Sequence, residues 1–152
     1  MSLTIRPITS SDKERWLVLW QGYLDFYKTA VAPEQTERTW NRIMDPEFNM
    51  KCAVAESDGM VIGFTTYNLQ NSTWSPSGHC YLEDLFVDPA VRGQGAGRAL
   101  IEFVKAYALE MKCSRLYWNT DEDNVVARKL YDTYVLDSGK RQYRIQLQDI
   151  PE

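Results

Sequence analysis

The sequence predicts a mixed α/β fold, in which a sheet of parallel and antiparallel strands is flanked by helices. The first observation is the order of strand-like and helical patterns along the 152 residues, which runs β-α-α-β-β-β-α-β-α-β. The second is a hairpin signal at Asp58-Gly59, and the third is an apolar strand that runs into a glycine-rich loop and a helix near residues 82–112. No linker, repeat or low-complexity tract interrupts this order, so residues 1–152 are expected to form a single domain.

The first half of the chain carries two helices between strands. Residues 4–7 alternate as a short strand, and Ser10-Ser11-Asp12 supplies N-cap chemistry for a helix from about residue 12 to 28. Pro33 suits the first position of a second helix that reaches about residue 44. Two strands, 51–57 and 60–69, then flank the Asp58-Gly59 turn.

The second half repeats the alternation of strand and helix. A polar loop over 71–78 precedes a strand over 79–87, and a helix from about residue 95 to 112 places its apolar residues on one side. A strand over 115–120, a helix from residue 124 to about 134 and a final alternating strand over 141–147 complete the expected order.

Composition excludes several classes of function. A net charge of -4 and a pI near 5.1 argue against a nucleic-acid partner, which usually meets a basic face. No run of 18 apolar residues predicts a membrane span, and the first residues show no signal-peptide pattern. Three widely spaced cysteines favour buried thiols in a reducing cytoplasm, and one histidine without a C-x-x-C or H-E-x-x-H pattern predicts no metal site.

The most informative segment reads L-F-V-D-P-A-V-R-G-Q-G-A-G-R over residues 85–98. Glycines between a strand end and a helix start let backbone N–H groups approach an anion, and the helix N-terminus adds partial positive charge. Gly97 is followed by Arg98-Ala99, so the segment is not a Walker loop. The third glycine comes one position too early for a dinucleotide fingerprint. The segment is therefore predicted to bind a different phosphate ligand.

Arg92-x-x-Gly95-x-Gly97 after Leu85-x-Val87-x-Pro89 resembles the pyrophosphate loop of the GNAT N-acetyltransferase superfamily, and the likeness extends over about residues 3 to 148. The resemblance implies a GNAT fold with a mostly antiparallel central sheet, and acetyl-CoA as acetyl donor. It assigns the cofactor contacts to Leu85, Phe86, Val87, Arg92, Gly93, Gln94, Gly95, Ala96, Gly97, Arg98, Asn124 and Tyr131.

Two residues are candidates for proton transfer. In GNAT enzymes a helix that begins near an asparagine carries Leu-Tyr about seven residues on, a pattern that Asn124, Leu130 and Tyr131 match. A tyrosine with a pKa near 10 is protonated at neutral pH and can donate a proton to a departing thiolate. Glu83 is the candidate base, acting through water, and a structural ion pair is its alternative role. Val135 and Leu136 replace the family's usual glycine-aromatic pair, which predicts a remodelled turn after the helix.

The run Y-L-E-D-L-F-V over 81–87, with W-N-T-D-E-D-N over 118–124, resembles the diamine, polyamine and fungal histone-and-polyamine acetyltransferases. That resemblance implies direct transfer to a primary amine, namely a polyamine, a lysine-like small molecule or a protein lysine. It also implies a homodimer. Glu83, Asp84, Trp74 and Trp118 are the expected acceptor-binding residues, with Tyr23 and Phe26 as further aromatic candidates. The alternatives are an enzyme that acetylates a drug or amino-acid amine, and a non-catalytic acyl-CoA-binding sensor or partner module.

Overall fold

A computed structural model describes residues 2–91 and 93–148. The contacts group into two units, Met1–Trp118 and Asn119–Glu152, and each is described by itself. The first unit contains the sheet and three helices. Its elements are β1 (Leu3–Pro7), the 3-10 turn η1 (Ser10–Asp12), α1 (Lys13–Phe26), α2 (Pro33–Met44), β2 (Lys51–Ser57), β3 (Met60–Gln70), β4 (His79–Val87), η2 (Pro89–Val91), α3 (Ala96–Glu110) and β5 (Leu116–Tyr117). The second unit contains α4 (Val125–Asp132).

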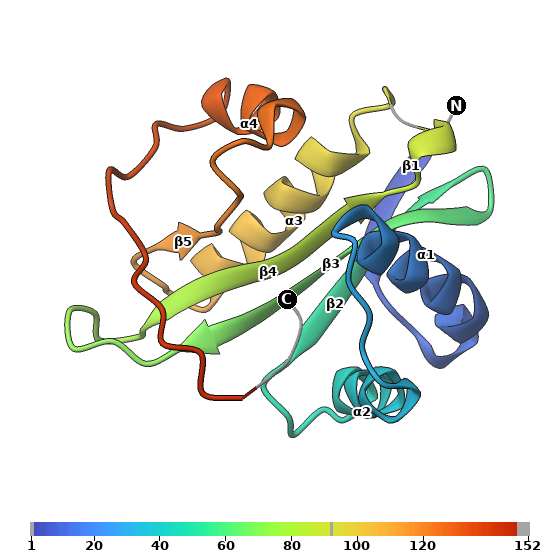
Figure 1. Cartoon of the computed structure of the whole chain (residues 1–152), viewed down its shortest axis with the longest axis horizontal. Coiled ribbons are helices and arrows are strands. Elements are labelled where there is room, and N and C mark those ends of the chain that lie inside the picture. The colour runs from blue at the N-terminus through green and yellow to red at the C-terminus, as the bar shows by residue number, and fades with distance from the viewer. Residues whose placement is uncertain (1, 92, 149–152) are drawn as a thin grey trace. The chain divides into compact units, whose positions relative to one another are not determined.

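The five strands form one mixed sheet in the order β1-β2-β3-β4-β5. The first four strands pair antiparallel, whereas β5 runs parallel to β4 and pairs with it at two positions. Helix α3 covers one face of the sheet, and α1 and α2 cover the other (Figure 1). The predicted mixed, mostly antiparallel sheet flanked by helices is confirmed.

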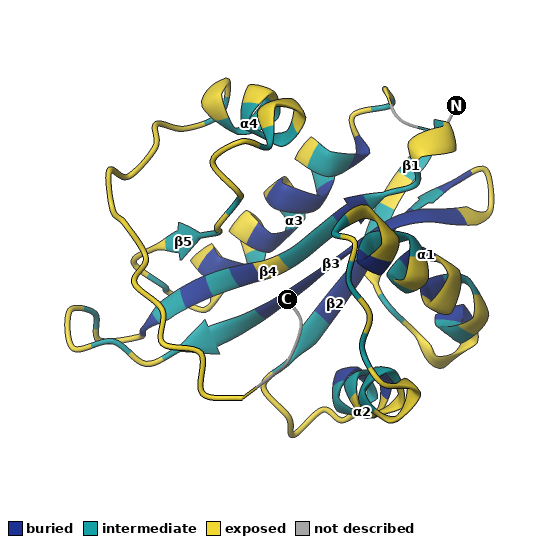
Figure 2. Cartoon of the chain, in the orientation of Figure 1, coloured by how far each residue is buried: buried dark blue, intermediate teal, exposed yellow. Residues whose placement is uncertain are grey.

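The hairpin between β2 and β3 turns where the sequence predicts it. Asp58 and Gly59 both adopt the left-handed conformation, with φ of 50° and 81°. Glycine and aspartate are among the residues that tolerate this conformation, which gives the turn the same twist as the strands it joins. The turn therefore fixes the pairing of two strands that are almost entirely buried (Figure 2).

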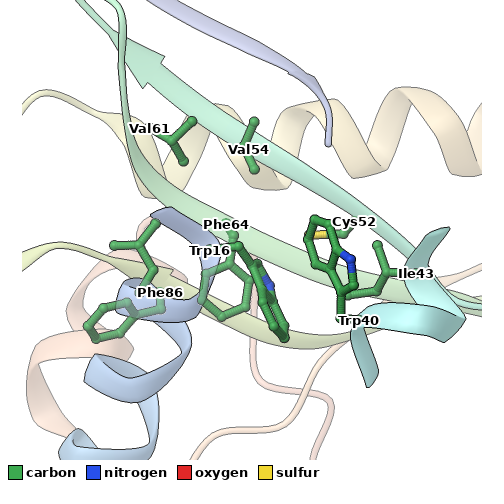
Figure 3. Close-up of a cluster of buried hydrophobic side chains, with 9 residues drawn as sticks. Trp16, Trp40, Ile43, Cys52, Val54, Val61, Phe64 and Phe86 are labelled. Atoms are coloured by element: carbon green, nitrogen blue, oxygen red, sulfur yellow. The ribbon is translucent and has the colours of Figure 1, made fainter. Parts of the chain in front are cut away.

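The main core lies between the sheet and helices α1 and α2 (Figure 3). Trp16 stacks on Trp20 with ring centroids 5.6 Å apart and lies 5.4 Å from Trp40, so aromatic rings fill most of this layer. The buried cluster consists of Trp16, Leu19, Trp40, Ile43, Cys52, Val54, Val61, Phe64 and Phe86. On the other face, α3 buries Leu100, Ile101, Val104 and Ala108, whereas Met111, predicted on the same apolar side, is 39% exposed just after the helix.

Two strand predictions need correction. The fifth strand was expected over 115–120 but covers only Leu116–Tyr117. The final strand expected over 141–147 is wrong, because these residues adopt no strand. Tyr143, Ile145 and Leu147 supply the alternation, yet they are 91%, 84% and 87% exposed. An alternating pattern forms a strand only where one face is buried against a partner, and nothing buries these side chains.

Two expectations from composition can be compared with the structure. Cys52, Cys80 and Cys113 are free thiols, and the first two are buried. Burial raises the pKa of the Cys80 thiol to about 12, so this thiol is protonated at neutral pH. Within the described residues, no helix is long and apolar enough to cross a membrane.

Candidate active site

The glycine-rich loop lies between β4 and α3. After Asp88 the chain makes the short turn η2, and Gly93 and Gly95 then take left-handed φ angles of 94° and 78°. A Cβ at either glycine would meet nothing within 4 Å. Glycine is thus required by the backbone conformation, and the space beside the loop remains open for a ligand.

The N-terminus of α3 follows the glycine loop directly. Gly95 is the N-cap residue, and its carbonyl accepts the first helical hydrogen bond from the Ala99 N–H at 3.0 Å. Gly95 offers no side-chain cap, so the N–H groups of Ala96 and Gly97 in the first turn have no acceptor within the helix. These donors and the helix dipole together suit a phosphate group.

The other predicted loop residues have distinct roles. Ala96 is 3% exposed and anchors the helix start in the core, and Gly97 lies in the first helical turn without a left-handed φ. Gln94 accepts a hydrogen bond of 3.1 Å from the Ser57 hydroxyl, so its side chain is turned back to the end of β2. Arg92, the expected cation at the mouth of the loop, lies outside the described residues.

Strand β4 contains a bulge at Glu83. Thr66 on β3 pairs with Asp84 and Tyr67 pairs with Leu82, so Glu83 is the extra residue between them. Strict alternation would place Tyr81 and Glu83 on one face and Asp84 on the other. The bulge instead puts Asp84 and Phe86 opposite Thr66 and Phe64, on the face that α1 and α2 cover.

The bulge separates the environments of the two neighbouring acids. Glu83 is exposed, whereas Asp84 is half-buried. Glu83, the expected base, is therefore the acid in contact with water, and Asp84 is the acid that is withdrawn from water. The sequence reading missed this difference because a one-residue bulge leaves no clear signal in the apolar pattern.

Asp84 is held by neutral hydrogen-bond donors. The Tyr23 hydroxyl of α1 donates to Asp84 Oδ1 at 2.7 Å, and the Thr66 side chain also hydrogen-bonds the carboxylate. Burial raises the pKa of Asp84, and these two bonds lower it only in part. In the described part of the chain, no ion pair joins Asp84 to a cation. An acid in this setting is suited to receive a cationic ligand.

The edge of β4 beyond the bulge lacks a strand partner on the β5 side. Pairing with β5 is confined to Cys80 and Tyr81 in the described residues. An extended ligand can add to this side of β4 beyond Tyr81, in the way that a strand adds to a sheet edge. Leu85 and Val87 are half-buried, but the Phe86 side chain is 6% exposed and belongs to the core, so only its main chain can contact a cofactor.

The aromatic candidates do not form one wall. Tyr23 contacts Asp84, but Phe26 is 49% exposed at the end of α1. Trp74, on the polar loop, is 89% exposed and encloses nothing. Trp118 is half-buried. Tyr81 and Tyr117, which were not singled out for this role, stack with centroids 5.0 Å apart, and the Tyr117 hydroxyl hydrogen-bonds Gln70.

Tyr131 and Asn124 lie in the second unit. Asn124 is the N-cap of α4, and its side chain accepts a hydrogen bond of 3.2 Å from the Ala127 N–H. Half-buried Tyr131 lies near the C-terminal end of this helix, where its carbonyl accepts bonds from the N–H groups of Tyr134 and Val135. The helix and its cap are confirmed, while the chemical roles of both residues stay predictions.

The site thus combines a glycine loop before α3 with a bulged strand that carries a half-buried acid. The chain matches the acetyltransferase (GNAT) family over residues 16–134, and it belongs to that family. It is an N-acetyltransferase.

Individual relatives agree with this assignment. The chain is 34% identical to the D-amino-acid N-acetyltransferase HPA3 of Saccharomyces cerevisiae over 93% of the chain and 89% of that protein. It is 39% identical to the thialysine N-epsilon-acetyltransferase of Bos taurus, over 47% of the chain and 41% of that protein. The solved aminoglycoside acetyltransferase AAC(6')-Iy has the same fold, with a TM-score of 0.83 at 18% identity over 97% of the chain and 99% of that structure.

Proposed function

We propose that this N-acetyltransferase takes its acetyl group from acetyl-CoA and transfers it to a primary amine that is a cation at neutral pH. Polyamines, lysine-like small molecules and exposed protein lysines are acceptors of this kind. The observation that carries the proposal is Asp84, a half-buried carboxylate held by Tyr23 and Thr66 and not paired with a cation in the described residues.

The donor half of the proposal rests on the loop before α3. The N–H groups of the first turn of α3 and two left-handed glycines with open space beside them fit a pyrophosphate. The unpartnered edge of β4 fits the extended, amide-bearing arm of CoA, because such an arm can pair with a strand edge. AAC(6')-Iy, a protein of the same fold, was solved with a bisubstrate analogue that contains CoA.

The acceptor half rests on charge. A diamine-like acceptor carries a second amine with a pKa of about 10.4, and Asp84 attracts and orients that ammonium group while the other amine reacts. The reacting amine must lose a proton before its nitrogen can attack the thioester carbonyl. Exposed Glu83, next to Asp84 at the bulge, can pass that proton to solvent.

The remaining steps need a donor for the developing oxyanion and a proton for the leaving sulfur. The developing oxyanion would accept a hydrogen bond from a main-chain N–H of β4 near the bulge. The new C–N bond forms as the C–S bond breaks, and the family resemblance assigns Tyr131 as the source of the thiolate's proton. No covalent enzyme intermediate is required.

An acceptor panel tests this function. Release of free CoA thiol from acetyl-CoA would be followed with a diamine, a polyamine, lysine, a lysine-containing peptide, an apolar D-amino acid and a neutral aromatic amine. We expect turnover to be fastest with the acceptors that carry a second positive charge. The opposite result is suggested by the relative named as a D-amino-acid N-acetyltransferase. A preference for an apolar D-amino acid would reject the proposal that the acceptor is cationic, and it would leave the proposal that acetyl-CoA is the donor unchanged.

A further inference from the structure

Helix α1 is tied to the segment that leads into the glycine loop. Arg15 Nε donates to the Val61 carbonyl at 2.7 Å, and its Nη2 donates to Asp88 Oδ2 at 2.9 Å. The side chains of Arg15 and Asp88 are 28% and 27% exposed, so water screens this pair less than a pair at the open surface. One guanidinium therefore links α1, strand β3 and the residue that follows β4.

Asp88 in turn fixes the first turn of the loop. Its N–H donates to the Ile62 carbonyl at 2.8 Å, which holds the main chain on β3. Its Oδ1 accepts from the Ala90 N–H and its carbonyl accepts from the Val91 N–H, each at 3.0 Å. Because Oδ2 bonds Arg15 while Oδ1 caps η2, the orientation of the carboxylate sets the direction in which η2 leaves the sheet.

A separate hydrogen bond holds the loop near Gln94, shortly before α3. Ser57, which is 7% exposed at the end of β2, donates to the Gln94 side chain. Between Asp88 and Gln94 lies Gly93, a residue with few conformational restraints. A loop rich in glycine loses much entropy when it is ordered, so fixing its ends before the ligand arrives favours binding.

We propose that Arg15 is a positioning residue for the cofactor loop, acting through Asp88 to hold η2 and the following glycines in the conformation that binds the pyrophosphate of acetyl-CoA. The role rests on the proposed function, since it presumes that this loop binds the donor. Arg15 does not touch the ligand in this account. Its effect is therefore specific to donor binding and depends on Asp88.

Calorimetric titration with CoA tests the pair. Arg15→Ala removes both donors, and Asp88→Asn keeps the acceptor for Ala90 while removing the charge. We expect each to raise the Kd for CoA roughly tenfold, less than the hundredfold that a displacement of 1 Å can cause. Because the proposed effect passes through the Arg15–Asp88 ion pair, which either substitution breaks, the double variant should also be about tenfold weaker, not a hundredfold. Lys13→Ala is the matched control, because Lys13 lies on α1 like Arg15 and forms an exposed ion pair with Glu37 of α2. Its Kd for CoA should stay within twofold of wild type.

Kinetics separate positioning from general damage. In Arg15→Ala the KM for acetyl-CoA should rise, while kcat/KM for the amine at saturating acetyl-CoA stays within twofold of wild type. Arg15→Lys keeps the charge but cannot donate in the same fork, so it should recover part of the affinity. If Arg15→Ala does not fold, Arg15→Lys and Asp88→Asn decide the question, and wild-type affinity in both overturns the role of Arg15.

Two results distinguish this inference from the proposed function. If wild type binds CoA and Gly95→Val abolishes binding, but Arg15→Ala and Asp88→Asn bind as wild type does, the inference is wrong and the function stands. The inference is also wrong if the losses of CoA affinity in Arg15→Ala and Asp88→Asn add fully in the double variant. If wild type does not bind CoA, or folded Gly95→Val binds it unchanged, the assignment of the loop itself fails.

Discussion

Replacing Asp84 with asparagine should lower activity without lowering stability at neutral pH. Burial raises the pKa of Asp84 because the charged form loses contact with water. A carboxyl with a raised pKa binds its proton more tightly in the folded chain than in the unfolded one. Its favourable contribution to folding is therefore complete below the ordinary pKa of 3.8 and is lost as the pH rises through the raised value. At pH 7 the ionised group destabilises the fold.

The expected size follows from two opposing effects. Each pKa unit of upward shift costs about 1.4 kcal/mol at neutral pH, and asparagine removes that cost. Asparagine also accepts a weaker hydrogen bond from Tyr23 than a carboxylate does, which costs about 1 kcal/mol. The net change at pH 7 should therefore not be a loss of stability, because removing the burial cost offsets the weaker hydrogen bond. For a chain of this length, each kcal/mol corresponds to about 2–4 °C in Tm.

Urea unfolding followed by tryptophan fluorescence at several pH values between 4 and 8 measures the effect, because buried Trp16 reports on the core. The advantage of Asp84→Asn over wild type should shrink as the pH falls, since protonation relieves the wild-type carboxylate. Asp121→Asn, at an exposed position, should show no such trend. A loss of more than about 1 kcal/mol at pH 7 that persists at low pH would show that the charge of Asp84 stabilises the fold and would refute this reasoning.

Three further predictions concern the loop and the proton transfers. Gly95→Val should abolish acetyl-CoA binding. The control is Gly59→Val in the hairpin turn, where the glycine is equally left-handed and a Cβ would meet nothing within 4 Å; it should lower stability and leave the affinity of the folded protein unchanged in the same titration. Equal losses of affinity in both variants would show a backbone effect only. Glu83→Gln should lower kcat/KM chiefly at pH values below the pKa of the acceptor, and the gap should narrow at high pH; a profile parallel to wild type would remove Glu83 from the base role. Tyr131→Phe should reduce kcat toward the lower end of the 10²–10⁴-fold range typical of general acids, with acetyl-CoA affinity retained; a fall below threefold, with chemistry shown to be rate-limiting, would leave Tyr131 a packing residue.

The sequence was sufficient for features that depend on local chemistry. Asp58-Gly59 predicts its hairpin because few residues accept a left-handed backbone, and the glycines before α3 predict a loop with left-handed residues for the same reason. That this loop binds an anion stays a prediction. The amphipathic pattern of α3 likewise predicts the side chains that it buries.

Features that depend on tertiary contacts were not predictable in this way. The bulge at Glu83 leaves Glu83 exposed and Asp84 half-buried. Only the pairing of β4 with Thr66 and Tyr67 reveals the bulge. The bonds from Tyr23 to Asp84 and from Arg15 to Asp88 join residues far apart in the chain. Segment 141–147 has the alternation of a strand, but its side chains remain exposed. The pattern therefore predicted one strand more than the sheet contains in the described residues.

The comparison of a diamine with a matched monoamine tests the central claim most directly. The two acceptors should be 1,4-diaminobutane and butylamine, assayed by release of CoA thiol with wild type and with Asp84→Asn. Wild type should prefer the diamine by roughly tenfold or more in kcat/KM, about the 1.4 kcal/mol that one well-placed charge interaction supplies. Most of that preference should be lost in Asp84→Asn. Equal turnover of the two amines by wild type, or a preference that Asp84→Asn leaves intact, would contradict the account.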